Sequence, residues 1–336
     1  MAIKEGAASW TGRRVLVTGA GGFIGSHLVE ILVARGASVR AFVRYTSRGD
    51  RGWLDRINTS IRREVDVFVG DLVNPEAVAG ALADCEVALH LGALIPIPYS
   101  YRHPREFVAA NVTGTLNVLE ASRREGVRRL VQVSSSEVYG SAKTVPIPEE
   151  HRLHPQSPYA ATKVAADQLA LSYARSFDLP VVVARPFNTF GPRQSARAVI
   201  PTIVTQALGR DRVELGTVET TRDFLYVADT VEGLARCAEV DGIVGEVFNL
   251  GTGHEYSIED VVQRVLTATG REVPLELTEE RRRPADSEVD RLCASVEKAR
   301  TRLGWEPRVS FDQGLRLTIE WLSESLAMYQ PEVYGV

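Results

Sequence analysis

A tyrosine and a lysine four residues apart, Tyr159 and Lys163, form the pair whose spacing most directly indicates chemistry. A four-residue step places both side chains on one face of a helix, so the ammonium can lie near the phenol oxygen and favour its ionised form. A phenol ionises near pH ~10, and lowering its pKa to about 7 needs roughly 4 kcal/mol of differential stabilisation. A close cation, a bound nicotinamide cation and a hydroxyl donor could together supply it, which makes Tyr159 a candidate general base. An isolated pair with this spacing is more often a solvated helix face, so the other motifs decide its interpretation.

A glycine-rich turn at 19–25 follows a β-branched run at 14–18 and precedes a predicted helix at 23–35. In this context glycines let the backbone approach a pyrophosphate, and the helix N-terminus stabilises its charge. The alternative is a glycine-rich turn without a ligand. We expect dinucleotide contacts from Gly19, Gly22, Phe23, Ile24 and Gly25.

The segment that follows the second predicted strand indicates which dinucleotide is bound. Arg44, Ser47 and Arg48 stand where a NAD-binding fold places an acidic residue on the ribose 2′-hydroxyl. Guanidinium and hydroxyl donors suit a 2′-phosphate, so we predict NADP as the cofactor, with NAD as the alternative if these arginines are simply solvated. Asp71, followed by Leu72, stands after the third predicted strand, where its carboxylate could accept from the adenine amino group or cap the following helix.

Short β-branched runs alternate with longer helical patterns in the first half of the chain, which is typical of a parallel, doubly wound sheet. The predicted strands are 14–18, 38–43, 66–69, 87–90, 130–133 and 180–184, and the predicted helices are 23–35, 75–82, 104–125 and 158–177. Beyond residue 186 the pattern becomes mixed, with helices predicted at 201–208, 227–238, 258–267, 295–303 and 311–323.

These elements predict an α/β fold, a Rossmann-type doubly wound parallel sheet with a smaller mixed α/β substrate-binding lobe. We place the dinucleotide-binding domain at 13–185 and the second lobe mainly at 186–330, with some of its segments returning to the first domain.

Composition excludes several classes of protein. The 336 residues carry 39 basic and 43 acidic side chains, a net charge of −4 that recruits neither nucleic acid nor an anionic membrane. Three distant cysteines indicate a reducing compartment, and six histidines without a metal-site spacing indicate no metal. No signal-like or membrane-spanning run is present, so we expect a cytoplasmic protein.

Several motifs together resemble the extended short-chain dehydrogenase/reductases that act on nucleotide sugars. The resemblance runs from about residue 13 to 325 and rests on the glycine turn, Asp71-Leu72, His90-Leu91-Gly92-Ala93, Asn111-Val112-x-Gly114-Thr115, Ser136-Glu137-Val138-Tyr139-Gly140, Tyr159-x-x-x-Lys163, Arg185-Pro186-Phe187-Asn188 and Arg222-Asp223-Phe224. The segments at 53–55, 97–101 and 191–201 most resemble the sugar 4,6-dehydratases of nonulosonic (legionaminic) acid pathways, which act on nucleotide-linked N-acetylglucosamine.

The resemblance implies roles for the catalytic candidates. Tyr159 would take the proton of the sugar 4-hydroxyl, Lys163 would hold the nicotinamide ribose, and Ser135 would hydrogen-bond the reacting oxygen. Glu137 would remove the C5 proton, made acidic by the new ketone at C4, while the C6 hydroxyl leaves as water. Leu91, Ala93 and Asn111 would line the dinucleotide.

One position departs from the dTDP-glucose dehydratase pattern. Ser136 replaces the aspartate that precedes the glutamate there, so the acid that protonates the leaving hydroxyl is unassigned. GDP-mannose 4,6-dehydratases and UDP-glucuronate decarboxylases also carry Ser-Glu at this point, so both reactions stay open. The alternative for Glu137 is a loop carboxylate without chemistry.

The resemblance also implies substrate contacts and an assembly. Residues in its motifs that would contact the sugar or its diphosphate are Tyr99, Ser100, Asn188, Arg193, Arg222 and Arg283. Arginine forks suit paired phosphate oxygens, although each could instead be a surface or interdomain residue. The helices at 104–125 and 158–177 are where this family builds a homodimer interface, and their apolar faces also fit ordinary packing against the sheet.

The sequence thus predicts an NADP-dependent nucleotide-sugar 4,6-dehydratase, a lyase, acting on UDP- or GDP-N-acetylglucosamine. A UDP-glucuronate decarboxylase or a nucleotide-sugar 4-epimerase is the alternative within the same class. A non-catalytic dinucleotide-sensing Rossmann protein is the alternative outside it.

Overall fold

A seven-stranded parallel sheet forms the centre of the first lobe in this computed structural model, which describes residues 10–329. Its order is β11-β6-β5-β4-β1-β2-β3. The strands span β1 Arg14–Thr18, β2 Ser38–Val43, β3 Asp66–Val69, β4 Val87–His90, β5 Arg129–Val133, β6 Val181–Pro186 and β11 Val247–Leu250. This is the Rossmann-type α/β fold that the strand–helix alternation predicts.

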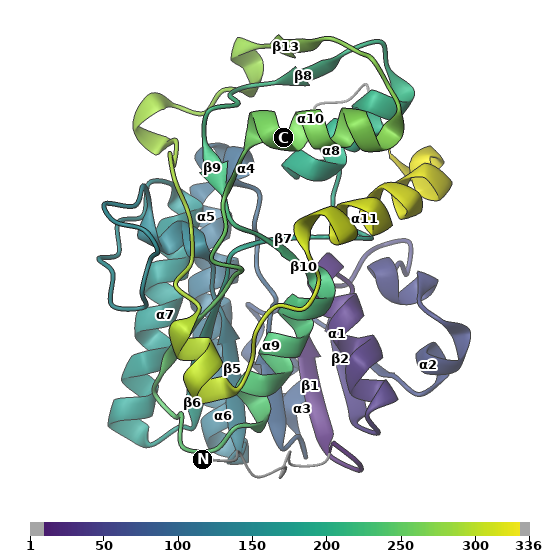
Figure 1. Ribbon diagram of the computed structural model, residues 1–336. Helices are drawn as coiled ribbons and strands as arrows, with labels where there is room; N and C mark the ends of the chain where they lie inside the picture. Colours follow the sequence, from purple (N-terminus) through teal and green to yellow (C-terminus); the bar gives the residue numbers. More distant parts are fainter. Residues whose placement is uncertain (1–9, 330–336) are drawn as a thin grey trace.

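Helices cover both faces of this sheet because its strands alternate apolar side chains between the two faces. Val15 and Val17 of β1 pack with α1 (Phe23–Ala34) and α9 (Val227–Glu239) in one buried cluster. Leu16 points the other way, into a cluster with α3 (Pro75–Leu82), α6 (Gly114–Glu125) and α7 (Pro158–Phe177). Figure 1 shows α1 and α9 in front of the strands.

The edge strand β11 was not among the predicted strands. It pairs in parallel with β6, with Val247 opposite Val183 and Leu250 opposite Pro186. The helix before it, α9, packs in the same cluster as α1, so chain beyond residue 186 completes the first lobe.

The second lobe lies above the sheet in Figure 1 and has its own apolar core. Its helices are α8 (Val199–Gly209), α10 (Ile258–Thr269) and α11 (Phe311–Ser325), which contact one another around Phe190, Phe224 and Phe311. Its strand pairs are β7 (Asn188–Phe190) with β10 (Phe224–Tyr226), β8 (Val213–Leu215) with β13 (Leu275–Leu277), and β9 (Thr221–Arg222) with β12 (Tyr256–Ser257). The predicted end of this lobe, residue 330, lies outside the described residues.

The helix predicted over 104–125 is divided by a π-helical stretch, so that α5 (Pro104–Phe107), η2 (Val108–Thr113) and α6 follow one another directly. The remaining short elements are η1 Gly52–Arg56, α2 Thr59–Arg63, α4 Ile97–Arg102, η3 Ser136–Tyr139, η4 Glu279–Arg281, η5 Ala285–Ser287, η6 Ala299–Leu303 and η7 Leu326–Met328. Within residues 10–329 no helix has the length and apolar character needed to cross a membrane.

Candidate active site

The predicted general base lies in the first turn of α7. Ser157 caps this helix by accepting a hydrogen bond from the Ala160 amide at 3.1 Å, and Pro158 occupies the first helical position. Tyr159 is therefore held where β5 ends, and its hydroxyl shares a hydrogen bond with Ser135. Tyr159 and Ser135 thus meet as the sequence predicted.

The pKa of the Tyr159 phenol is raised, whereas the sequence predicted that it would be lowered. Burial raises the pKa of Tyr159 to about 12, and the hydrogen bond with Ser135 only partly opposes this. The carboxylates of Glu137 and Asp167 raise the pKa further. The protein alone therefore does not depress the phenol pKa, because desolvation of the anion outweighs the local donors.

Lys163 lies one helical turn further along α7, with only 5% of its surface exposed. Its Nζ donates to the carbonyl of Val133 at 2.6 Å, which fixes the ammonium at the carboxyl end of β5. Burial lowers the pKa of Lys163 to about 8, while Asp167 raises it. The pKa of Lys163 is thus closer to neutral pH than that of a surface lysine.

Glu137 belongs to a compact cluster of opposite charges. Its Oε1 lies 3.9 Å from Nη1 of Arg283, and the same Nη1 lies 3.6 Å from Oε1 of Glu288. Arg222 contacts that glutamate oxygen at 3.3 Å. Burial lowers the pKa of Arg222, and Glu137 and Glu288 oppose this effect. Two guanidinium groups and two carboxylates therefore surround one side of the Tyr159 site.

The aromatic segment at 99–101 presents one residue to this cluster. The Tyr101 hydroxyl lies 2.6 Å from the Ser287 hydroxyl, and its pKa, raised by burial, also responds to Arg283 and Glu137. Ser100 is fully buried and donates to the Ile97 carbonyl, whereas the Tyr99 phenol donates to Glu106. The structure thus brings Tyr101 to the site and gives Tyr99 and Ser100 other partners.

Two further substrate candidates separate in space. Asn188 lies at the start of β7, directly after β6, and its buried Oδ1 has no hydrogen-bond partner among the described residues. Such an oxygen is costly unless a ligand supplies a donor. Arg193 instead turns to helix α1, where Nη1 contacts Glu30 at 2.7 Å and Ser26 at 3.2 Å. The structure does not bring Arg193 to the Arg222 and Arg283 cluster.

Ser136 is buried at the first position of η3, beside Glu137. The backbone there is organised by Ser135, whose Oγ accepts from the Glu137 amide at 3.2 Å. In this turn Ser136 is buried, whereas the next residue, Glu137, contacts Arg283.

The glycine turn leaves no room for side chains. Gly19 has φ of +67°, and a Cβ there would lie 2.9 Å from the Gly92 amide nitrogen. A Cβ on Gly25 would lie 2.2 Å from the Gly19 carbonyl oxygen, and one on Gly22 would lie 3.1 Å from it. The turn leads directly into α1, which begins with Phe23 and Ile24. A close-packed backbone cradle at a helix N-terminus fits a dinucleotide pyrophosphate.

The predicted ribose and adenine contacts lie at the ends of β2 and β3. Arg44 is 77% exposed on its side chain, and its Nε lies 3.9 Å from Oδ2 of Asp71. Asp71 Oδ1 accepts from the Val73 amide at 3.1 Å, so the aspartate also organises the turn. Ser47 and Arg48 are exposed in the same loop as Arg44.

The remaining dinucleotide candidates lie after β4. Asn111 is buried in η2, exchanges hydrogen bonds with the backbone of Leu94 at 2.8 and 2.9 Å, and donates to Thr162 at 3.0 Å. It therefore holds the segment that carries Leu91 and Ala93, both half-buried, against α7. Leu72 packs over Gly92 in the same region.

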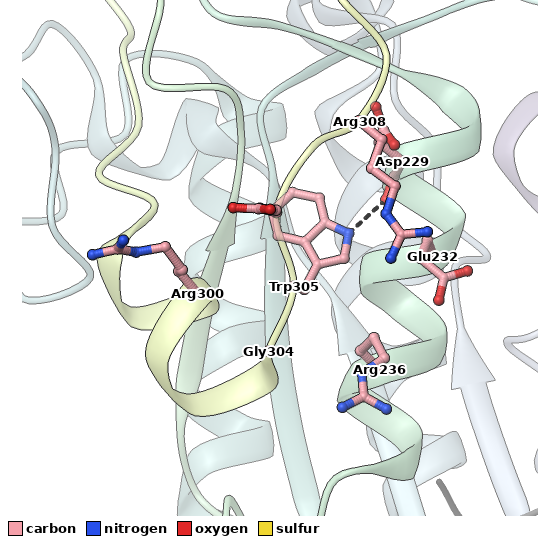
Figure 2. A pocket seen from close by; sticks show the side chains of 8 residues that line it. Asp229, Glu232, Arg236, Arg300, Gly304, Trp305 and Arg308 are labelled. Carbon is pink, nitrogen blue, oxygen red and sulfur yellow. Dashed lines mark hydrogen bonds between the residues drawn. The ribbon is translucent and has the colours of Figure 1, made fainter. Parts of the chain in front are cut away.

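A separate cavity of about 410 Å³ lies on α9 and the segment at 300–308. Figure 2 shows its centre, where Trp305 donates from Nε1 to the Asp229 carbonyl at 3.1 Å. Arg236 there is bound to the Leu303 carbonyl and Glu239. None of the predicted site residues lines this cavity, and within residues 10–329 no group of histidine, cysteine and acidic side chains could hold a metal.

The sequence interpretation missed two charged residues of this site. Glu288 is far from Glu137 in sequence, and no spacing rule links them. Asp167 follows Lys163 by four residues on α7, so the same helical periodicity that paired Tyr159 with Lys163 could have found it.

Comparison with known proteins places the chain among enzymes. The family described as GDP-mannose 4,6 dehydratase matches residues 16–318. A dTDP-glucose 4,6-dehydratase of an Actinoplanes species is 34% identical over 92% of this chain and 97% of that protein. UDP-glucuronic acid decarboxylase 1 of Xenopus tropicalis is 32% identical over 94% of this chain and 73% of that protein.

Among solved structures, the dTDP-glucose 4,6-dehydratase DesIV of Streptomyces venezuelae, with NAD and TYD bound, has a TM-score of 0.86 and 30% identity. The match covers 95% of this chain and 99% of that one. The chain therefore belongs to the GDP-mannose 4,6-dehydratase family of extended short-chain dehydrogenase/reductases, and it is an enzyme of the nucleotide-sugar dehydratase type.

Proposed function

We propose that this enzyme is an NADP-dependent nucleotide-sugar 4,6-dehydratase that acts on UDP- or GDP-N-acetylglucosamine. The observation that carries the proposal is the position of Glu137, which lies close enough to the Tyr159 phenol to raise its pKa and also contacts Arg283. Tyr159, as the base for a sugar hydroxyl, and Glu137, as the base for a C–H proton, would thus share one site.

Tyr159 begins the reaction by taking the proton of the sugar 4-hydroxyl, with Ser135 donating to the reacting oxygen. A dinucleotide held by the glycine turn and Lys163 would supply hydride transfer from C4 to C6, so the reaction would have no net oxidation. Because burial raises the phenol pKa, ionisation of Tyr159 depends on positive charge brought by the bound ligand.

Glu137 acts once C4 is a ketone. The ketone acidifies the C5 proton, Glu137 removes it and passes it to the C6 hydroxyl, which leaves as water. Arg283 lies 3.9 Å from the carboxylate and orients it. The proton that Tyr159 took from the 4-hydroxyl returns to C5 as hydride is delivered to C6, which leaves a 4-keto-6-deoxy sugar.

Arg222 and Arg283 are proposed to hold the nucleotide diphosphate, with Asn188 nearby. Guanidinium forks bind paired phosphate oxygens, and the unpartnered Asn188 Oδ1 can accept from a ligand hydroxyl or amide. Glu288 contacts both arginines and holds them side by side.

The first prediction tests the role of Glu137. Glu137→Gln should complete the oxidation at C4 and accumulate reduced cofactor, yet should not exchange solvent deuterium into C5. Absorbance of the reduced nicotinamide and mass spectrometry of the sugar in D₂O measure the two effects. Glu106→Gln, which removes a carboxylate bound to Tyr99, is the matched control and should behave as the native enzyme.

Rival reactions give different products in the same assay. A decarboxylase would release carbon dioxide from UDP-glucuronate, and a 4-epimerase would incorporate no deuterium at C5. The proposal fails if the native enzyme shows either pattern, or if Glu137→Gln forms the 4-keto-6-deoxy sugar at near-native rate.

The second prediction concerns the choice of dinucleotide. Exposed Arg44, with Ser47 and Arg48, offers donors to a 2′-phosphate, so calorimetric titration should show tighter binding of NADP than of NAD. Arg44→Ala should remove most of that preference, whereas Arg63→Ala, an exposed arginine on α2, should not. Tighter binding of NAD by the native enzyme would contradict this assignment.

A further inference from the structure

A buried carboxylate lies beneath the Tyr159 and Lys163 pair. Asp167 is on α7, four residues after Lys163, and no part of it is exposed. Its Oδ2 accepts from the Ser134 hydroxyl at 2.9 Å and from Nε of Arg185 at 3.0 Å. Ser134 follows Val133, whose carbonyl accepts from Lys163, so Asp167 and Lys163 are fixed to the same strand end.

Asp167 is only partly neutralised by these partners. Its Oδ1 is buried and has no hydrogen-bond partner among residues 10–329. Arg185 cannot move to cover that oxygen, because its Nη1 donates to the Tyr139 hydroxyl at 2.9 Å, which in turn donates to Asn249 at 2.7 Å. Burial raises the pKa of this carboxyl, and Arg185, Ser134 and Lys163 oppose that rise, so the charge of Asp167 is coupled to that of Lys163.

The charged surroundings of Lys163 leave Asp167 as its main source of negative charge. From β4, His90 is buried and neutral, with a pKa lowered to about 3 by burial and by Lys163. From β6, Arg185 is a like charge already paired with Asp167. On α7 itself, Tyr159 stays protonated because burial raises its pKa. From η3, Glu137 affects the pKa values of Tyr159 and Arg222. From α6, Glu120 binds Tyr173 at the far end of α7.

We propose that Asp167 is a positioning residue that keeps Lys163 protonated, and thus able to hold the dinucleotide, through neutral and mildly alkaline pH. The inference rests on the proposed function only in assigning Lys163 to the dinucleotide. Burial lowers the pKa of Lys163 and Asp167 raises it, which agrees with the geometry. Ser134 and Arg185 orient the carboxylate and limit how much of its charge reaches the lysine.

The test measures dinucleotide affinity as a function of pH rather than turnover. Calorimetric titrations of the full chain, stripped of bound nucleotide, run from about pH 6 to about pH 10. Because the ammonium form of Lys163 binds, affinity should fall as pH rises through the lysine pKa. In Asp167→Asn this fall should begin about one pH unit lower, since the favourable charge is lost.

Asp167→Asn leaves Arg185 buried without a counter-charge, so a second variant protects the test against misfolding. Asp167→Asn combined with Arg185→Met removes both charges. The dinucleotide affinity of this double variant should also fall at a lower pH than that of the native protein, by a smaller shift than in Asp167→Asn alone. Glu120→Gln removes a carboxylate that binds the same helix through Tyr173, and it should leave the midpoint unchanged.

A purely structural role for Asp167 would lower affinity equally at every pH. The proposal is overturned if either folded variant keeps the native midpoint or shifts it upward. Because dinucleotide binding is measured without any sugar, failure of the dehydratase assignment leaves this result interpretable.

Discussion

At the scale of single residues, the hydrogen bond between Tyr159 and Ser135 and the burial of the phenol have opposite effects on the pKa of Tyr159. The Ser135 hydroxyl is hydrogen-bonded to the phenol that we propose as the base, but burial still holds the pKa of the phenol at about 12. We therefore expect Tyr159 to stay neutral until a ligand brings positive charge beside it.

Removal of this phenol oxygen gives the prediction at the residue scale. Tyr159→Phe should abolish turnover and retain dinucleotide and substrate affinity, because only the ionisable oxygen is lost. Steady-state assays and calorimetry measure the two properties. Tyr173→Phe removes a phenol oxygen from the same helix, where it binds Glu120, and should retain activity. More than a few percent residual activity in Tyr159→Phe would show that another base serves C4.

Local spacing accounts for which site residues could be predicted. Helical spacing pairs Tyr159 with Lys163, whereas Ser135 and Glu137 received their roles from the family resemblance. The contacts of Arg283 with Glu137 and Glu288 could not be derived from spacing, because they join distant segments whose paths depend on tertiary packing.

Among the elements, the turn between β1 and α1 is tightly constrained. The Gly19 carbonyl lies where a Cβ on Gly25 would be, and both belong to backbone held by β1 and α1. Such an overlap cannot be relieved by rotating a side chain, so the turn itself would have to move.

Gly25→Ala should therefore lose most dinucleotide affinity and about 1–3 kcal/mol of unfolding free energy. Calorimetry and urea denaturation measure these effects. Gly80→Ala in α3 would meet only the Phe68 ring, at 3.3 Å, and should keep native dinucleotide affinity. Native affinity in Gly25→Ala would show that the turn is less rigid than its packing indicates.

Periodicity predicted most elements of the sheet, with one instructive exception. The first six strands are β-branched runs between helices and were found at nearly the same residues. β11 was missed because Val247–Leu250 is short and follows a segment read as the second lobe. Only its pairing with β6 makes it a strand.

Considered as a whole, the molecule leaves apolar side chains exposed on the two helices predicted to form a dimer interface. Val108 of η2 and Leu116 of α6 are 50% and 37% exposed, and Phe177 at the end of α7 is 47% exposed. Exposed apolar residues on adjacent helices are typical of surfaces that pack against another protein.

We therefore expect a homodimer that forms through these helices. Leu116→Arg should convert it to a monomer in sedimentation velocity experiments, because an unpaired charge would be buried at the interface. Leu317→Arg, at a residue of α11 that is 40% exposed, should leave the assembly unchanged. A native monomer, or a Leu116→Arg dimer, would exclude this interface.

The C-terminal part of the chain returns to the first lobe more than once. β11 pairs with β6, and η6 and Trp305 pack in the apolar core beside the sheet. Exchange of one continuous C-terminal block should not transfer a substrate preference cleanly, since that block also carries an edge strand and two helical segments of the first lobe. Recombination between relatives would need several matched crossovers. Changes in sugar preference should therefore accumulate as point substitutions and loop exchanges, with the sheet inherited intact.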